Sequence, residues 1–348
     1  MTFGIIGQER AVTVLRRAVE DPERLSHAYL FAGPEHVGRA TAARRFAQAL
    51  NCEADADRPC GECRACRLIA EDKHPDVEWV TVGGICDESD HRDHVADNSR
   101  DIRICQLRRI ERIVSRTTVD ARCRVVIVNP AEAMTVEAAN AFLKTLEEPA
   151  PNTVLILIAA REELLRETVR SRCRRVAFGA VPRAQVEQAL RERWGADATQ
   201  ADRLARLAQG RLGLAVTLLQ DERLLIERER TLDEIESVLA GGFGERFTYA
   251  ASLGSRFSRD PQAVRASLER WLDWWRDVLV TAAGQEPLAV EGERLDTLRA
   301  HAAQYGVGGA VQALSAISEG RRHLEEHAGP TLAMEVMLLE VPAGRPRR

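Results

Sequence analysis

The sequence predicts an α/β domain with a mostly parallel sheet, followed by two all-helical domains. Apolar strand-like runs alternate with helical patterns up to about residue 178, and the pattern after Pro182 is exclusively helical. The length of 348 residues also exceeds the size at which a single core stops growing. We expect domains at residues 1–178, 179–221 and 222–340, with a tail at 341–348.

The predicted α/β domain has a strand, a glycine loop and a helix near its start. A helical pattern covers residues 8–19, a buried strand follows at 27–32, and Gly33-Pro34 ends that strand. An alanine-rich helix is expected at residues 39–51. Two continuous apolar runs then predict strands covered on both faces, at 124–128 and 153–160, alternating with helices at 136–147 and 162–170.

The rest of the chain is expected to be helical. Short helices are predicted at 183–194, 200–209 and 212–219. Longer helices should run between about residues 223 and 339, with breaks near Gly241-Gly242 and within 284–292. One of them carries a stripe of three tryptophans, for which we favour core packing: Trp271, Trp274 and Trp275.

The composition excludes several classes of protein. The net charge is −4, from 49 basic and 53 acidic residues, so bulk charge gives no argument for nucleic-acid binding. The longest apolar run, residues 153–160, is far shorter than a membrane span, and the first residues lack the pattern of a signal peptide. We therefore expect a soluble cytoplasmic protein, whose eight cysteines indicate metal ligands or free thiols.

Residues 33–40, GPEHVGRA, have the glycine spacing of a phosphate-binding loop. Gly33 and Gly38 stand at the two glycine positions. Arg39 replaces the lysine that reaches the β- and γ-phosphates, and Ala40 replaces the hydroxyl that binds Mg²⁺. The loop therefore predicts descent from a nucleotide site that has lost its working side chains.

The following strands show the same losses. A nucleoside-triphosphatase carries acidic residues after the second of these strands, but residues 124–128 run into Asn129-Pro130. A polar residue that senses the γ-phosphate would follow the next strand, where this chain has Ala159-Ala160. These positions agree with the loop in predicting no ATP hydrolysis.

Four cysteines follow the predicted loop helix with the spacing C-x₇-C-x₂-C-x₂-C. Four thiolates complete a closed tetrahedral zinc site with no open position for water, so we expect a structural Zn²⁺ ion rather than a catalytic one. The alternative is a set of unpaired buried thiols. The expected ligands are Cys52, Cys60, Cys63 and Cys66, whereas four other cysteines are expected to be free thiols, at positions 86, 105, 123 and 173.

Two further segments leave alternatives open. Residues 83–99 are polar and contain His91 and His94, which permits a second metal site, although a solvated loop is the simpler interpretation. The helix that follows carries five arginines beside an apolar stripe, so it presents either a DNA- or partner-facing surface or a solvated face. These arginines are at positions 103, 108, 109, 112 and 116.

The motifs together resemble the gamma, tau and delta-prime group of subunits of the bacterial DNA polymerase III clamp loader, in the AAA+ superfamily. The resemblance covers roughly residues 4–175. It implies a RecA-like AAA+ domain with an inserted zinc module at about 52–66, then a helical lid and a helical collar that joins subunits. The segments that carry it are GQERAVTVLRRAV, LSHAYLFAGPEHVG, the four clustered cysteines, MTVEAANAFLKTLEEPAPNTVLIL and ETVRSRC.

Within this group, the lost side chains favour delta-prime over the ATP-hydrolysing gamma/tau subunits. The family's nucleotide-sensing lid arginine falls at Leu214, which is a further loss. For Arg172, composition alone favours a solvated surface arginine. The resemblance instead implies that Arg172, beside Ser171 in the SRC motif, is an arginine finger for the ATP site of a neighbouring gamma/tau subunit.

The resemblance also implies partners. The chain would join gamma/tau and delta subunits in a hetero-pentamer that loads the sliding clamp at a primer–template junction, in the cytoplasm near the nucleoid. It would be no enzyme by itself but a component of the DNA polymerase III holoenzyme. The competing hypotheses are an ATP-hydrolysing gamma/tau-like motor and a zinc-dependent DNA-binding module unrelated to a loader.

Overall fold

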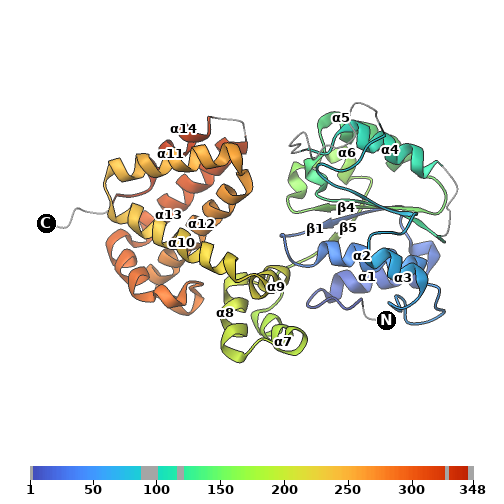
Figure 1. The fold of residues 1–348 in the computed structure, drawn as a ribbon, viewed down its shortest axis with the longest axis horizontal. Helices are drawn as coiled ribbons and strands as arrows, with labels where there is room; N and C mark the ends of the chain where they lie inside the picture. Colours follow the sequence, from blue (N-terminus) through green and yellow to red (C-terminus); the bar gives the residue numbers. More distant parts are fainter. Residues whose placement is uncertain (1–2, 88–100, 116–120, 326–328, 344–348) are drawn as a thin grey trace. The chain divides into compact units, whose positions relative to one another are not determined.

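The structure, a computed structural model, describes residues 3–87, 101–115, 121–325 and 329–343. The chain forms two compact units, Met1–Val216 and Thr217–Arg348 (Figure 1). The boundary between them lies inside helix α9 (Leu212–Gln220). The expected division into three domains at 178 and 221 stays a prediction.

The first unit is built on a five-stranded parallel sheet with the strand order β2-β3-β4-β1-β5. Helices connect the strands, as parallel pairing requires. The strands are β1 (Ala28–Ala32), β2 (Val77–Val80), β3 (Arg124–Val128), β4 (Thr153–Ala159) and β5 (Arg174–Ala177). Helix α1 (Glu9–Glu20) and the 3-10 turn η1 (Pro22–Arg24) precede β1. The connecting helices are α2 (Arg39–Asn51), α3 (Arg64–Ala70), α4 (Ile104–Val114), α5 (Val136–Glu147) and α6 (Glu167–Arg170), with the 3-10 turns η2 (Ala131–Ala133) and η3 (Glu162–Leu164).

Helices cover both faces of this sheet (Figure 1). Successive strand residues point to opposite faces, so Tyr29 and Phe31 pack with apolar side chains of α1, α2 and α3. Leu30 points the other way and packs with side chains of α4, α5 and α6. The continuous apolar runs of β3 and β4 are buried at every position, which explains why their sequences show no polar alternation.

The expected fold class, a parallel α/β domain followed by helices, is confirmed. The predictions missed both edge strands, because β2 is only four residues long and β5, RRVA, buries only Val176. The helix expected at 162–170 is wrong: η3 and α6 are separate turns. Between them the chain is extended at Leu165, whose side chain turns into the core, and a continuous helix would not allow that.

After β5 the first unit ends in short helices. These are α7 (Arg183–Trp194), α8 (Ala198–Ala208) and the first part of α9. Gly195 ends α7 with a left-handed φ of 71°, a conformation that glycine adopts without a Cβ penalty. Asp197 caps α8, since its carboxylate accepts a hydrogen bond from the Gln200 N–H.

The second unit is a helical bundle. Its core contains the three tryptophans Trp271, Trp274 and Trp275, which have no exposed surface, so the expected core stripe is confirmed. Among the described residues, no helix is both long enough and apolar enough to pass through a membrane. The bundle consists of α10 (Glu222–Ala240), α11 (Phe243–Arg259), α12 (Pro261–Ala282), α13 (Leu295–Glu325, kinked at Gly306) and α14 (Pro330–Glu340), with the turns η4 (Glu286–Leu288) and η5 (Gly292–Arg294).

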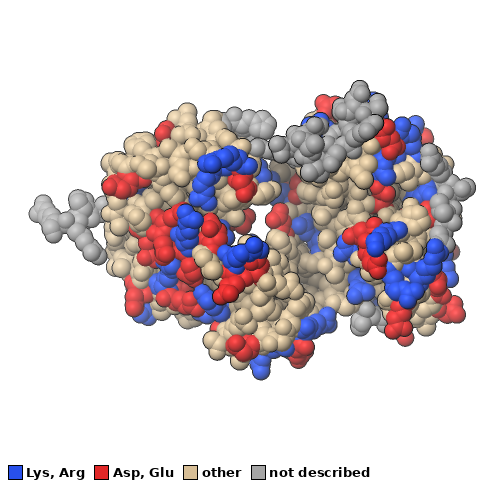
Figure 2. Space-filling model, in the orientation of Figure 1, with Lys and Arg blue, Asp and Glu red and all other residues tan. Residues whose placement is uncertain are grey.

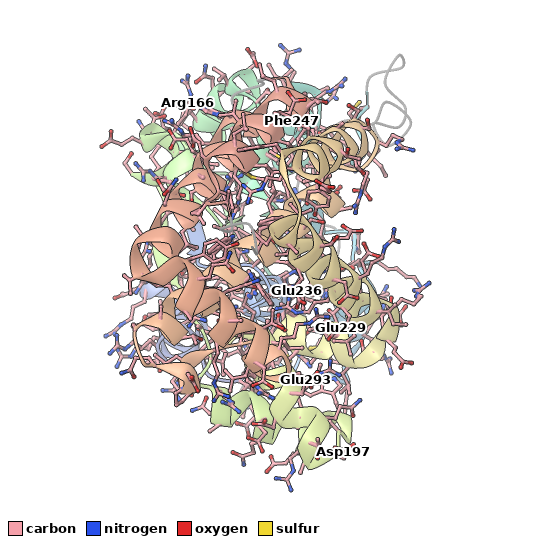
Figure 3. The ribbon with its side chains drawn as sticks, turned by 90° about the vertical axis from the view of Figure 1, so that its left-hand side faces the viewer. Arg166, Asp197, Glu229, Glu236, Phe247 and Glu293 are labelled. Carbon is pink, nitrogen blue, oxygen red and sulfur yellow. The ribbon has the colours of Figure 1, made fainter. Side chains whose placement is uncertain are left out.

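Charged groups join α10 to the turns that precede α13. Arg294 pairs with carboxylates of α10, including Glu229 and Glu236, which Figure 3 labels near Glu293. Charges of both signs are intermixed over α10 on the face that Figure 2 draws. The charges of α10 therefore include a network that fixes these turns against the bundle.

A buried carboxylate holds the same region from α12. Asp277 is fully buried, and its Oδ2 accepts hydrogen bonds of 2.7 Å from the backbone N–H groups of both Val290 and Glu291. Burial raises the pKa of Asp277 to about 6 from its ordinary value of 3.8, although these N–H groups act in the opposite direction. The Asp277 side chain therefore holds the turn by accepting these bonds, but its ionised form is costly to bury.

We expect Asp277→Asn to change how the stability of the bundle depends on pH. Because the folded-state pKa lies above the unfolded value, protonated Asp277 stabilises the fold at acidic pH, and this contribution is lost as the pH rises through about 6. Between pH 4 and pH 7 the variant should therefore gain up to ~3 kcal/mol relative to the native chain. Urea unfolding followed by tryptophan fluorescence measures this difference.

The matched control is Asp296→Asn, since the Asp296 side chain is fully exposed. Its stability difference from the native chain should stay constant over the same pH range. A constant difference for Asp277→Asn as well would contradict the prediction.

Candidate functional site

The sheet brings the predicted phosphate-loop residues together at one edge. Strands β1 and β3 both pair with β4 in parallel, so their carboxyl ends meet there. Gly33 follows β1, Asn129 follows β3, and Ala160 follows β4. The Gly33 N–H donates a 3.3 Å hydrogen bond to the carbonyl of Ala159, which joins the loop directly to the end of β4.

The loop keeps the backbone conformation of a phosphate cradle. Gly38 has a left-handed φ of 100° and directly precedes α2, whose first N–H groups face the loop. Gly33 tolerates no side chain, because a Cβ there would lie 2.1 Å from the carbonyl oxygen of Phe178. The glycines that predicted the loop are thus explained by its backbone, whatever it binds.

Arg39 is buried at the start of α2. It is 8% exposed, and its Nη1 has no hydrogen-bond partner among the described residues. Burial lowers the pKa of Arg39, whereas the nearby carboxylates of Glu132 and Glu35 raise it. The guanidinium therefore has counter-charges within the chain itself.

Glu132 is a residue that the sequence analysis missed. Its Oε1 accepts hydrogen bonds from the backbone N–H groups of Ala160 at 2.8 Å and Arg161 at 3.2 Å. The carboxylate therefore binds the end of β4 rather than standing free at the end of β3. Only its place two residues after Pro130 could have indicated it.

The positions that usually supply magnesium ligands carry other residues at this edge. Mg²⁺ takes oxygen ligands in near-ideal octahedral geometry, usually one or two carboxylates and a hydroxyl beside the phosphates. Here the hydroxyl position is Ala40 and the acidic positions are Asn129 and Pro130. Besides backbone N–H groups and Arg39, this edge holds the carboxylate of Glu132, whose Oε1 is bonded to the N–H groups after β4.

Other contacts fix the loop from outside. The buried side chain of Gln8 donates from Nε2 to the carbonyls of Gly179, at 2.7 Å, and Val37, at 3.3 Å, and accepts from the Gly179 N–H. The N–H of Gly213, at the start of α9, donates a 2.7 Å bond to the carbonyl of His36. Leu214, at the expected lid-arginine position, comes directly after this contact.

The four predicted metal ligands are brought together after α2. The sulfur atoms of Cys52, Cys60, Cys63 and Cys66 all lie within 4.8 Å of one another, which is compatible with one structural zinc ion. Backbone N–H groups point at the sulfurs: that of Cys60 at Cys52, 3.4 Å away, and that of Cys63 at Cys60, 3.3 Å away. Such contacts favour thiolates, the form that binds metal.

The thiols of this cluster have different acidities. Backbone N–H groups of Cys63 and Glu62 lower the pKa of Cys60 to about 6, whereas burial raises the pKa of Cys66. A bound dication would stabilise the thiolate form of both. The donor set and the N–H contacts therefore fit Zn²⁺.

Polar side chains of α2 connect the cysteine cluster to the sheet. Gln48 donates a 2.6 Å hydrogen bond to the carbonyl of Cys66. One turn of helix later, the Asn51 side chain accepts a 3.0 Å bond from the N–H of Cys123, just before β3. Both side chains are buried, so the cluster is continuous with the core of the first unit.

The structure places Arg172 and Ser171 at the opposite edge of the sheet. They follow α6 and precede β5, which runs parallel to β1 and pairs Arg174 with Tyr29. This is where the strands begin, whereas the phosphate loop lies where they end. The Arg172 guanidinium is one-third exposed, and its Nη2 lies 2.5 Å from Glu147 Oε1.

The remaining expectations have mixed outcomes. Two of the five arginines near α4 are engaged by carboxylates, Arg109 by Glu78 and Asp87, and Arg112 by Asp87. This favours the paired, solvated face over a free basic surface. Arg116, His91 and His94 lie outside the described residues.

The eight cysteines are all free of disulfides, and burial raises the pKa of Cys123 and Cys173 to about 12.

The chain is similar to known DNA polymerase III subunits. The model of the family described as "DNA polymerase III, delta subunit" matches residues 7–182, just over half of the chain. The chain belongs to this family. Within it, the chain is 26% identical to the DNA polymerase III subunit delta' of Bacillus subtilis over 97% of both chains. It is also 38% identical to the subunit delta' of Pseudomonas aeruginosa over 42% of both chains.

Members of the wider group are similar as well. The chain is 25% identical to the DNA polymerase III subunit tau of Bacillus subtilis and spans 60% of that protein's length. A solved gamma subunit-related protein from Thermotoga maritima covers 95% of the chain with 19% identity and a TM-score of 0.40.

Proposed function

We propose that the chain is the delta-prime subunit of a DNA polymerase III clamp loader, a non-hydrolysing member that completes the ATP site of a gamma/tau neighbour. The observation that carries this proposal is the separation of its two half-sites. The phosphate loop lies at the carboxyl edge of the sheet, and Arg172 lies at the amino edge. Arg172 is therefore placed to serve another chain and not its own loop.

Arg172 has the properties that a finger needs. An arginine binds phosphate oxygens with a planar fork and stays charged, and one supplied by a neighbour can accelerate phosphoryl transfer by 10³–10⁵. Its guanidinium is accessible at the end of a short helix, and Ser171 beside it is exposed. Arg166, labelled in Figure 3 at the start of the same helix, is bonded to Asn140.

In this proposal the phosphate loop of the chain has a structural role and no catalytic one. Arg39 has its counter-charges in Glu132 and Glu35, and the metal-binding oxygens of an ATPase are replaced. Gly33, Gly38 and Arg39 would then form a vestigial cradle that keeps the AAA+ shape without turnover. The alternative is a gamma/tau-like motor, which would need metal ligands that this edge does not provide.

The second unit offers a surface for joining the loader subunits gamma/tau and delta in a hetero-pentamer. Helices α13 and α14 pack together, and Gln312 of α13 donates a 2.8 Å hydrogen bond to the carbonyl of Glu340 in α14. Both expose apolar side chains at helical spacing, which in water favours burial against a partner. These residues are Val307, Val311, Leu332, Val336 and Leu339. In this role the complex acts on the sliding clamp and primer–template DNA.

We expect the purified chain to show no ATP hydrolysis above background. The lysine, the metal-ligating hydroxyl and the acidic pair are all replaced, and phosphoryl transfer needs each of them. The measurement is magnesium-dependent phosphate release, compared with that of a gamma/tau subunit. Turnover that disappears in Arg39→Ala would support the motor instead.

We expect one equivalent of zinc per chain. A structural zinc site contributes folding energy directly, so Cys63→Ser should lower the zinc content and destabilise the segment after α2. Elemental analysis and hydrogen exchange over residues 52–70 measure the two effects. Cys173→Ser, which lies outside the cluster, is the control and should keep its zinc; less than half an equivalent in the native chain would argue against the site.

We expect Arg172→Ala to leave folding and assembly intact while slowing ATP hydrolysis by a loader reconstituted with gamma/tau and delta. The finger acts on the transition state, so hydrolysis at the one site it completes should fall about 10³-fold or more. Total hydrolysis falls less, because the other sites continue, and clamp loading falls further. Arg172→Lys should not restore the rate, since a lysine lacks the planar fork. An unchanged rate with Arg172→Ala would remove the finger role.

A further inference from the structure

The Arg172 side chain is held by two contacts within its own chain. Its Nη2 lies 2.5 Å from Oε1 of Glu147, the last residue of α5, and its Nη1 donates a 2.8 Å hydrogen bond to the carbonyl of Thr168. Thr168 is four residues earlier, so the guanidinium folds back over α6. In this arrangement it points along its own helix end and is bound to a carboxylate.

The ion pair of the nearby Arg175 has more hydrogen bonds than that of Arg172 and serves as a comparison. Arg175 makes three hydrogen bonds to both oxygens of Glu162, from Nε at 3.0 and 2.7 Å and from Nη2 at 2.6 Å. This is the bidentate geometry that fixes an arginine. Arg172 contacts a single oxygen of its carboxylate partner through Nη2, and its Nη1 is bonded to the Thr168 carbonyl instead of the second carboxylate oxygen.

Breaking the Arg172–Glu147 ion pair also costs little free energy. Both side chains are accessible, at 36% and 49% of their surface, and an ion pair in such a position adds little to stability. A phosphoryl group offers the guanidinium the same kind of oxygen acceptor with more charge. A phosphate presented by a neighbouring chain can therefore replace the carboxylate without a large cost.

We propose that Glu147 is a positioning residue for Arg172: its carboxylate is the resting partner that the guanidinium exchanges for the phosphoryl group of a neighbour's ATP. The inference rests on the proposed function, because it needs Arg172 to enter a neighbour's site. It assigns a role to the first glutamate of the segment TLEEP, which is the last residue of α5. Glu147 thereby sets how readily Arg172 is released, and not how fast it acts once bound.

The first test uses the isolated chain. In Glu147→Gln, which keeps the shape and removes the charge, the Arg172 side-chain ¹⁵N–¹H signal should exchange with solvent faster than in the native chain. The signal is identified by its loss in Arg172→Ala. Glu162→Gln is the matched control, since it should affect the Arg175 signal and leave that of Arg172 unchanged. Unchanged exchange at Arg172 in Glu147→Gln would overturn the contact.

The second test uses the loader reconstituted with gamma/tau, delta and each variant. Glu147→Gln should lower the ATP concentration for half-maximal hydrolysis about two- to fivefold, the range of an exposed ion pair, with the maximal rate unchanged. In the Arg172→Ala background, Glu147→Gln should have no further effect. Glu162→Gln should match the native complex.

The outcomes separate this inference from the proposed function. If Arg172→Ala leaves hydrolysis unchanged, the finger role fails. If Arg172→Ala slows hydrolysis while Glu147→Gln leaves half-saturation unchanged, the finger stands and the exchange role of Glu147 is overturned. A lower maximal rate at unchanged half-saturation, or an effect that persists with Arg172→Ala, also overturns it.

Discussion

The parallel direction of the five strands is the constraint on which the rest of the first unit depends. Because every strand begins at one edge and ends at the other, residues after β1, β3 and β4 meet at one side, and residues before β5 lie at the opposite side. The phosphate loop and Arg172 are therefore held apart by the length of the strands. They lie at different edges of the sheet and do not form one site within the described residues.

Internal contacts hold the phosphate loop at the carboxyl edge. Arg39 is buried near Glu132 and Glu35, and Glu132 in turn binds the N–H groups that follow β4. Gln8 and Gly213 hold the loop carbonyls from the other side. Buried charges and polar groups are tolerated when they have such partners. The loop is thus held in place by contacts within the chain itself.

The central part of the fold was predictable because its signals are local. Apolar runs gave β3 and β4, the glycines gave the loop, and the cysteine spacing gave a cluster that the structure brings together. The edge strands were missed because β5 exposes most of its residues and carries little apolar pattern. Glu132 and Glu147 were missed for another reason: their partners are distant in sequence, so no spacing identifies them. The role of Arg172 came from family resemblance, since a single surface arginine has no signature of its own.

The polar bonds of α2 have a consequence for the cysteine cluster. Gln48 binds the backbone of Cys66, and Asn51, at the end of the same helix, holds the N–H that precedes the central strand β3. The last turn of α2, from Gln48 to Asn51, therefore contacts both the cysteine cluster and the start of β3. An oxidant that converted these thiolates to a disulfide would shift the last turn of α2 and loosen the start of β3.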